Sequence, residues 1–258
     1  MDAVLKRLRR QVVLATLAAN EGHIPSSFCV LEILWALYDR VLRLDPANPA
    51  DEGRDRFVLS KGHASLALYA VLAEKGFFPS SELAGFATAG SRLGGHPDLR
   101  KVPGVEASTG SLGHGFPMAV GMAMALKRRS SSSRVFVLVG DGECNEGTVW
   151  EAALLASRER LDNLTLVVDQ NHSTDAATPL GDLVAKMRAF GWDASAVDGH
   201  DLDALQAALS ASTAGSPRAV VAETVRGFGC RRIEAEPGAW HHGAPGPADL
   251  AAILEELA

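Results

Sequence analysis

Two short apolar runs rich in β-branched residues constrain the fold of this chain more than any other feature. Val135–Val139 and Leu164–Val168 have the continuous hydrophobicity of strands that are buried on both faces, as in a parallel sheet. Polar residues follow each run, with Asp141 after the first and Asn171 after the second. The carboxyl ends of parallel strands meet at one edge of a sheet, where open α/β sheets bind ligands. We therefore expect Asp141 and Asn171 to lie side by side at that edge.

The chemistry of these residues indicates a hard cation and a phosphate. A carboxylate with an amide oxygen suits Mg²⁺ or Ca²⁺ better than zinc, and Mg²⁺ commonly accompanies a phosphorylated ligand. Gly140 and Gly142 flank Asp141 without side chains, so backbone N–H groups can approach a phosphate. The motif alone leaves a second interpretation open, in which G-D-G is a tight turn and Asn171 caps a loop.

Helical and strand patterns alternate along the chain. This alternation favours a doubly wound α/β fold, with a mostly parallel sheet and helices on both faces. No internal repeat or long linker interrupts it, so residues 1–258 are expected to form one domain. Further strands are predicted at 56–60, 192–197 and 218–224, and the main helices at 3–20, 30–41, 116–127, 183–190, 202–214 and 247–257, with Ser26 and Ser27 capping the second helix.

Composition argues against several classes of function. The net charge of -6 gives no reason to expect nucleic-acid binding, and the alanine-rich runs at 119–126 and 204–214 are too short to span a membrane. Cys29, Cys144 and Cys230 are widely spaced and form no zinc framework, which fits a reduced cytoplasm.

A glycine-rich turn at residues 109–115 opens the helix at 116–127, a position suited to holding an anion or a closely packed ligand. Its order, G-x-x-G-x-G, differs from the dinucleotide fingerprint and argues against a nucleotide-binding dehydrogenase. All eight histidines fall in predicted loops or strand–helix junctions. Histidine there can transfer protons and bind hydroxyl groups.

Several motifs, taken in order, resemble those of one enzyme family. They are N-E-G-H (20–23), R-D-R-F-V-L-S-K-G-H-A (54–64), G-G-H-P-D (94–98), V-E-A-S-T-G-S-L-G-H-G (105–115), G-D-G-E-C-N-E-G (140–147) and W-H-H-G-A-P (240–245). The chain resembles the N-terminal half of transketolase, and specifically the separately encoded N-terminal subunit of two-gene transketolases. The resemblance implies a thiamine diphosphate (ThDP)-dependent transfer of a two-carbon ketol unit from a ketose, or its phosphate, to an aldehyde.

The resemblance also assigns roles to residues. It implies that Mg²⁺, which Ca²⁺ can replace, is held by the side chains of Asp141 and Asn171 and by the backbone carbonyl of Ser173. It places Glu146 at a subunit interface. The implied cofactor contacts are His63, Gly110, Ser111, Leu112, Gly140, Asp141, Gly142, Glu143, Asn171 and Ser173.

The implied catalytic histidines are His23, His63, His96 and one late histidine. For the late one two candidates stay open, because the preceding tryptophan favours His241 and the following Gly-Ala-Pro favours His242.

A partner is implied as well, because the family's catalytic glutamate belongs to a following pyrimidine-binding domain. The resemblance therefore implies an obligate C-terminal partner subunit in a heterotetramer with two copies of each chain, and no catalysis by this chain alone. We expect sugar phosphates or aldehydes as substrates, with no nucleic acid and no membrane involved.

The sequence departs from the family pattern at two places. The family usually has Gln at the position of His114, and Gly-Leu or Gly-Ile at the positions of His172 and Ser173.

Two alternatives remain beside the main interpretation. One is another ThDP enzyme, such as a deoxyxylulose-phosphate synthase fragment or the α subunit of a 2-oxo acid dehydrogenase. The contexts of His63, His96 and W-H-H-G-A-P argue against it. The other is a non-catalytic paralogue with the role of a partner or regulatory subunit. The intact Asp141 and Asn171 argue against that role.

Overall fold

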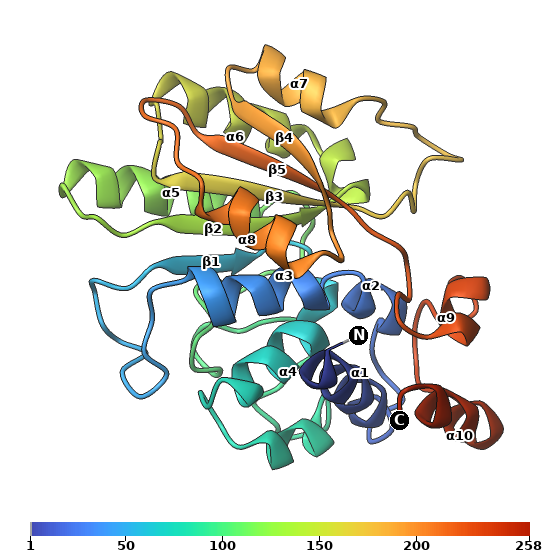
Figure 1. Ribbon diagram of the computed structural model, residues 1–258. Coiled ribbons are helices and arrows are strands. Elements are labelled where there is room, and N and C mark those ends of the chain that lie inside the picture. The colour runs from blue at the N-terminus through green and yellow to red at the C-terminus, as the bar shows by residue number, and fades with distance from the viewer. Residues whose placement is uncertain (1) are drawn as a thin grey trace.

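The computed structural model describes residues 2–258. At its centre is a five-stranded sheet in the order β1-β2-β3-β5-β4, in which every neighbouring pair is parallel (Figure 1). The α/β fold with a parallel sheet that the sequence predicts is thereby confirmed. The strands are β1 (Arg56–Leu59), β2 (Val135–Gly140), β3 (Leu164–Gln170), β4 (Asp193–Asp198) and β5 (Arg218–Glu223).

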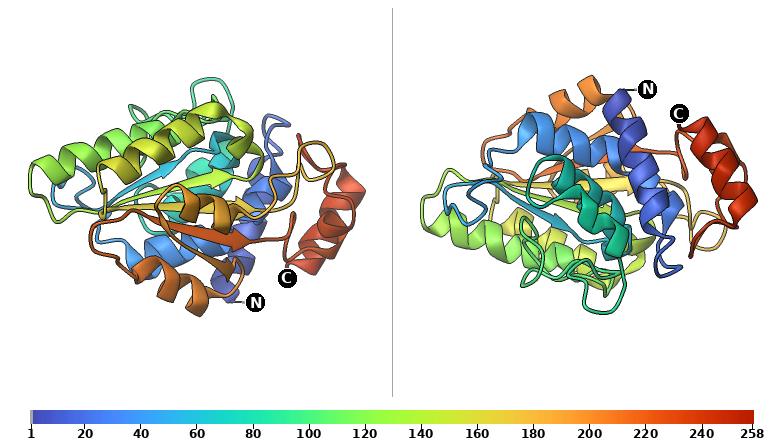
Figure 2. Two further views of the ribbon diagram at one scale, coloured as in Figure 1. Left: turned by 90° about the horizontal axis from the view of Figure 1, so that it is seen from above. Right: turned by 90° about the horizontal axis from the view of Figure 1, so that it is seen from below.

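Alternate residues of the central strands contribute their side chains to two separate hydrophobic cores. Phe136 and Leu138 of β2 belong to one core, and Val137 and Val139 belong to the other. Figure 2 shows α5 and α6 on one side of the sheet and α3 and α8 on the other. The first core includes α1 (Ala3–Ala15), α3 (Leu31–Ala36), α4 (Ser65–Glu74) and α8 (Leu202–Ser210), and the second includes α5 (Gly115–Arg128), α6 (Gly147–Arg158) and α7 (Leu183–Ala189).

Some predicted helix boundaries are wrong. The helix predicted at 3–20 ends at Ala15, because the chain turns before Gly22, whose φ of +133° an L side chain rarely adopts. Ser26 and Ser27 are not caps: they lie inside α2 (Ile24–Phe28), which Pro25 opens at a first-turn position that needs no amide hydrogen. The helix predicted at 30–41 is α3 followed by one wider turn, and α8 stops at Ser210 rather than at residue 214.

The last segment returns to the first helix. It carries α9 (Arg231–Ala235) and α10 (Pro247–Glu256), and Figure 1 shows α10 near α1. The ammonium of Lys6 donates to the backbone oxygen of Ala258 at 2.7 Å, and Arg10 donates to the carbonyl of Leu254 at 2.8 Å. Further along, the N–H of Gly243 donates to the carbonyl of Gly22 at 3.0 Å, and the N–H of Ala244 donates to Asn20 Oδ1 at 2.9 Å, so residues 243–244 lie beside residues 20–22. Within residues 2–258 no helix combines the length and the apolar character that a membrane crossing would need.

Candidate active site

The carboxyl ends of β2 and β3 bring together the three residues predicted to bind a cation. Asp141 follows β2 and is buried, and Asn171 follows β3. The amide nitrogen of Ser173 lies 3.3 Å from Asp141 Oδ2 and 3.1 Å from Asn171 Oδ1. The Ser173 hydroxyl also donates to Asp141 Oδ1 at 3.1 Å. The carboxylate and the amide oxygen therefore face the same point.

This donor set fits a hard divalent cation beside a diphosphate. Two oxygen donors of different types converge without a thiol or imidazole, the pattern that Mg²⁺ and Ca²⁺ prefer. A Cβ added to Gly142 would lie 3.0 Å from Thr174 Cγ2, so glycine at this position allows the loop after Asn171 to pack closely against the turn after Asp141. No group of three or more His, Cys, Asp or Glu within residues 2–258 could hold a metal ion, so a zinc-type cluster is absent from that part of the chain.

The predicted cofactor turn, Gly110-Ser111-Leu112, is seated on the junction between β1 and α4. A Cβ on Gly62 would come within 3.0 Å of the Gly110 nitrogen, and one on Gly110 would lie 3.3 Å from His96 Cδ2. Ser111 is exposed and Leu112 is half-buried, so both can face a ligand. Glycine at these positions allows a close approach of three loops.

The side chain of Glu143 joins loops within the protein. Its carboxylate is buried, accepts a hydrogen bond from the Ser60 hydroxyl, and accepts backbone N–H groups from Gly113 at 2.8 Å and Gly140 at 3.3 Å. Burial raises the pKa of Glu143 and outweighs these hydrogen bonds, each of which lowers it. The side chain therefore ties the segments of Ser60, Gly113 and Gly140 together, and the contact of Glu143 with a cofactor stays a prediction.

Four histidines form a cluster beside the predicted cofactor turn, Gly110-Ser111-Leu112. The ring of His23 lies 5.3 Å from His63, 5.3 Å from His241 and 5.0 Å from His242, measured between ring centres. We call these four residues the histidine cluster; His96 adjoins it through Gly110. The structure places both late candidates beside His23, with His241 Nδ1 3.3 Å from Arg226 Nη2 and His242 Nε2 3.2 Å from Glu21 Oε1.

The surroundings of the cluster favour neutral imidazoles. Burial, with the charges of His241 and His242, lowers the pKa of His23 to about 4. Burial and the charge of Lys61 lower the pKa of His63, and burial and Arg226 lower that of His241. A neutral imidazole has one donor and one acceptor nitrogen, as binding a substrate hydroxyl requires.

The remaining predicted positions lie at the rim of the site. Glu146 is exposed between the turn at residues 142–145 and α6, as an interface residue needs to be. His172 has a φ of +59°, in the region that favours glycine. It pairs with the carboxylates of Asp175 at 2.7 Å and Glu223 at 3.0 Å. The hydrogen bond to Asp175 is the largest cause that raises the pKa of His172, and burial opposes it.

Sequence reasoning missed two buried charged residues beneath the ligands, Lys61 and Asp169. Lys61 stands in the strand–helix junction of S-K-G-H-A, and Asp169 is the one acid within β3. An acid at the end of an apolar strand, together with a lysine at a neighbouring junction, was the available signal. Both residues are almost completely buried and form an ion pair of 2.5 Å.

Fold and site together define a class: a parallel α/β domain that binds a diphosphate-containing cofactor through a divalent cation. The family model described as "Transketolase, thiamine diphosphate binding domain" matches residues 2–257. The chain belongs to the transketolase family and corresponds to the N-terminal subunit of its two-component members.

Relatives support this placement. An apulose-4-phosphate transketolase subunit of Actinobacillus succinogenes is 40% identical, over all of this chain and 95% of the relative. The 6-deoxy-6-sulfo-D-fructose transketolase subunit SqwG of a Clostridium species is 41% identical, over 81% of this chain and 78% of the relative. Because both relatives are named as subunits, a partner is implied for chains of this type.

Solved structures agree. The transketolase of Leishmania mexicana matches all of this chain with a TM-score of 0.88 at 28% identity, and that of Campylobacter jejuni does so with the same score and identity. The match covers 41% and 43% of those two proteins, so this chain spans about two fifths of the length of a single-chain transketolase.

Proposed function

We propose that this chain is the cofactor-binding half of a transketolase that passes a two-carbon ketol unit from a ketose, or ketose phosphate, to an aldehyde acceptor. One observation carries the proposal. Asp141 and Asn171 converge on Ser173 at the same sheet edge at which the glycine-rich turn adjoins the histidine cluster. This arrangement supports a diphosphate anchor beside a set of groups for a polyhydroxylated substrate.

The anchor would consist of Asp141, Asn171 and the Ser173 carbonyl around Mg²⁺, or around Ca²⁺ in its place. The backbone N–H of Gly142 would bind the diphosphate, and the turn Gly110-Ser111-Leu112 would lie along the thiamine. When bound, ThDP supplies the reactive carbon and the electron sink needed to break a carbon–carbon bond next to a carbonyl.

The histidines would orient the substrate and move protons. His23 and His63 are expected to be neutral at pH 7, because their pKa values are lowered. Each can then donate to one substrate hydroxyl while accepting from another. His96 and one of His241 and His242 would complete the wall of the substrate pocket.

A separate C-terminal subunit would supply the catalytic glutamate and the pyrimidine-binding residues, in a heterotetramer with two copies of each chain. Glu146, exposed at the rim, would lie at the interface. The names of the two relatives mention a phosphorylated and a sulfonated sugar, so ketoses with an anionic group are the first donors to test. We place the complex in the cytoplasm, where the three buried thiols would stay reduced.

Calorimetric titration of ThDP with Mg²⁺ into the chain, with and without the C-terminal subunit, tests the proposal. We expect saturable, Mg²⁺-dependent binding that tightens with the partner and is lost in Asp141→Ala. Binding without ketol transfer, but with decarboxylation of a 2-oxo acid, would point to another ThDP enzyme. Absence of binding by a well-formed complex would refute the proposal and favour a non-catalytic paralogue.

A further inference from the structure

A buried carboxylate lies directly beneath the proposed cation ligands. Asp169, near the end of β3, has no exposed surface and accepts three hydrogen bonds. The donors are Asn171 Nδ2 at 2.7 Å, Lys61 Nζ at 2.5 Å and the hydroxyl of Thr224. These donors come from three segments: the loop after β3, the junction of β1 with α4, and the end of β5. Asp169 is therefore held from three directions.

The surroundings of Asn171 specify which way its amide points. An ionised carboxylate only accepts hydrogen bonds, so the Asn171 atom that faces Asp169 has to be the NH₂ group. On the other side the Ser173 N–H only donates, so the atom that faces it has to be Oδ1, at 3.1 Å. Both neighbours select the same orientation, and it directs the oxygen toward the side where Asp141 lies.

We propose that Asp169 is a positioning residue: it fixes the amide of Asn171 so that its oxygen, and not its nitrogen, is presented to the cation. The inference rests on the proposed function, because it assumes that Asn171 is a ligand. An amide free to turn by 180° about its last torsion would offer an NH₂ group, which repels a cation, in part of the population. Partners that orient metal ligands typically contribute 10–100-fold in metal affinity.

Lys61 is the charged partner of Asp169. Its side chain is 1% exposed, and its ammonium also donates to the carbonyl of Ser26 at 3.4 Å. Burying either charge without the other would be costly, so each residue supports the other's burial. Because the pair is buried, a loss of function in a single variant could reflect only an unpaired charge. The test therefore uses variants that remove both charges.

Two double variants separate orientation from simple structural support. Lys61→Met/Asp169→Asn removes both charges but keeps at residue 169 an oxygen that accepts from Asn171. Lys61→Met/Asp169→Leu removes the charges and the acceptor together, with similar volume. Titrations of Mg²⁺ at fixed ThDP use the full chain with its C-terminal subunit. We expect the asparagine variant to bind Mg²⁺ within about 3-fold of the wild type and the leucine variant about 10–100-fold more weakly. Equal affinities in the two variants would overturn the inference.

A second pair of variants covers the case in which the leucine variant does not fold, as circular dichroism would show. Asn171→Asp keeps an oxygen ligand but sets a carboxylate against Asp169. We expect it to weaken Mg²⁺ binding, and to recover in combination with Lys61→Met/Asp169→Asn, whose amide can donate. No recovery would contradict the orienting role.

A spectroscopic readout keeps this inference distinct from the proposed function. In the ¹⁵N-labelled full chain, the Asn171 side-chain NH₂ signal, identified by its loss in Asn171→Asp, should exchange slowly with water. It should exchange rapidly in the leucine double variant and slowly in the asparagine one. If the wild type binds no ThDP, the proposed function fails, while this signal still shows whether Asp169 holds the amide. Fast exchange in the wild type refutes the inference whatever the titrations give.

Discussion

At the scale of single residues, the histidine cluster joins positions that are far apart in the sequence into one electrostatic unit. His23 is surrounded by His63, His241 and His242. The charges of His241 and His242 lower the pKa of His23, whereas the charge of Glu21 raises it. Burial contributes most to the lowered pKa of His23, and its neighbours add to it. An extra proton on one of these rings therefore disfavours a proton on the next.

The protonation of His23 is directly testable. We expect its ring to titrate by NMR with a midpoint near pH 4. The unfolded chain binds a proton to this group near pH 6.5, so between pH 6.5 and 4 it holds more protons than the folded chain, and stability falls as the pH is lowered. His242→Gln should move the midpoint upward by removing one positive neighbour. His114→Gln, outside the cluster, is the control and should leave the midpoint unchanged. A midpoint above pH 6 in the wild type would show that the cluster is solvated.

Single residues also show where sequence reasoning reaches its limit. Asp141 and Glu143 stand two positions apart in G-D-G-E, yet one faces the ligand edge and the other points inward to Ser60 and Gly113. A 3-10 turn over Gly142–Asn145 makes the two side chains point in different directions. The local sequence gives no signal that predicts this turn. Asp169 was missed for a similar reason, because its partners Lys61 and Thr224 are distant in sequence.

At the scale of elements, the strands were predictable and the ends of the helices were not. Short continuous runs rich in β-branched residues are typical of strands buried on both faces of a parallel sheet, so β2 and β3 could be predicted from the local sequence. The end of α1 and the start of α2 depend on Gly22, which packs closely against Leu66 of α4. A tertiary contact of this type cannot be read from local propensity.

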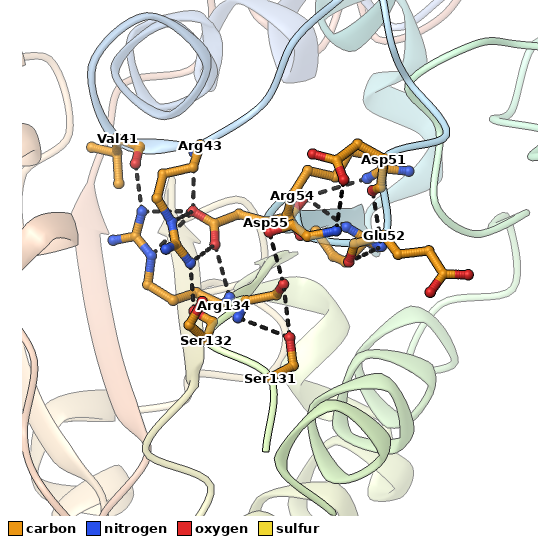
Figure 3. Close-up of polar contacts among 12 residues, drawn as sticks. Val41, Arg43, Asp51, Glu52, Arg54, Asp55, Ser131, Ser132 and Arg134 are labelled. Atoms are coloured by element: carbon orange, nitrogen blue, oxygen red, sulfur yellow. Dashed lines mark hydrogen bonds and ion pairs between the residues drawn. The ribbon is translucent and has the colours of Figure 1, made fainter. Parts of the chain in front are cut away.

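The amino ends of β1 and β2 are joined by a clamp that consists of Asp55, Arg43 and Arg134 (Figure 3). Asp55 is buried and pairs with Arg43 at 2.8 Å and with Arg134 at 2.7 Å, and it also accepts the backbone N–H groups of both. Burial alone would raise the pKa of Asp55, but the hydrogen bonds from Arg43 and Arg134 outweigh it and lower the pKa. The clamp lies at the end of the strands away from the site.

We expect Asp55→Asn to lower the free energy of unfolding by about 2–3 kcal/mol, because charged hydrogen bonds are lost at a buried position. Asp162→Asn is the matched control, since Asp162 pairs with Lys127 at the surface, and it should cost less than about 1 kcal/mol. The folded-state pKa of Asp55 is lowered, so its contribution is present above its ordinary value of 3.8 and is lost as the pH falls through the folded-state pKa. Urea denaturation at pH 7 and below pH 4 measures both effects. Equal losses in the two variants at pH 7 would contradict the clamp.

At the scale of the whole molecule, the first helix connects the core on its side of the sheet to the late segment that carries His241 and His242. Arg9 of α1 is completely buried, pairs with Glu32 of α3 at 2.6 Å, and donates to the carbonyl of Phe228 at 2.7 Å. His200 completes the network: it lies 3.3 Å from the other oxygen of Glu32, and its Nε2 accepts the N–H of Val225 at 2.9 Å. The loop after β5 is thus fixed by residues from the beginning and the middle of the chain.

This network leads to a prediction about long-range coupling. Arg9→Met leaves the carboxylate of Glu32 buried without its main partner and should cost about 3–5 kcal/mol, whereas Arg9→Met/Glu32→Gln should recover part of that loss. Arg7→Met, on the same helix, removes a partly exposed pair with Glu74 and should cost less than about 1 kcal/mol. Urea denaturation gives the stabilities, and hydrogen exchange of residues 225–243 should accelerate in Arg9→Met but not in Arg7→Met. Because that segment brings His241 and His242 to His23, faster exchange there would show that the first helix stabilises a site to which it adds no side chain. If the two arginine variants exchange alike, the late segment is held by its local contacts and α1 contributes only to the core.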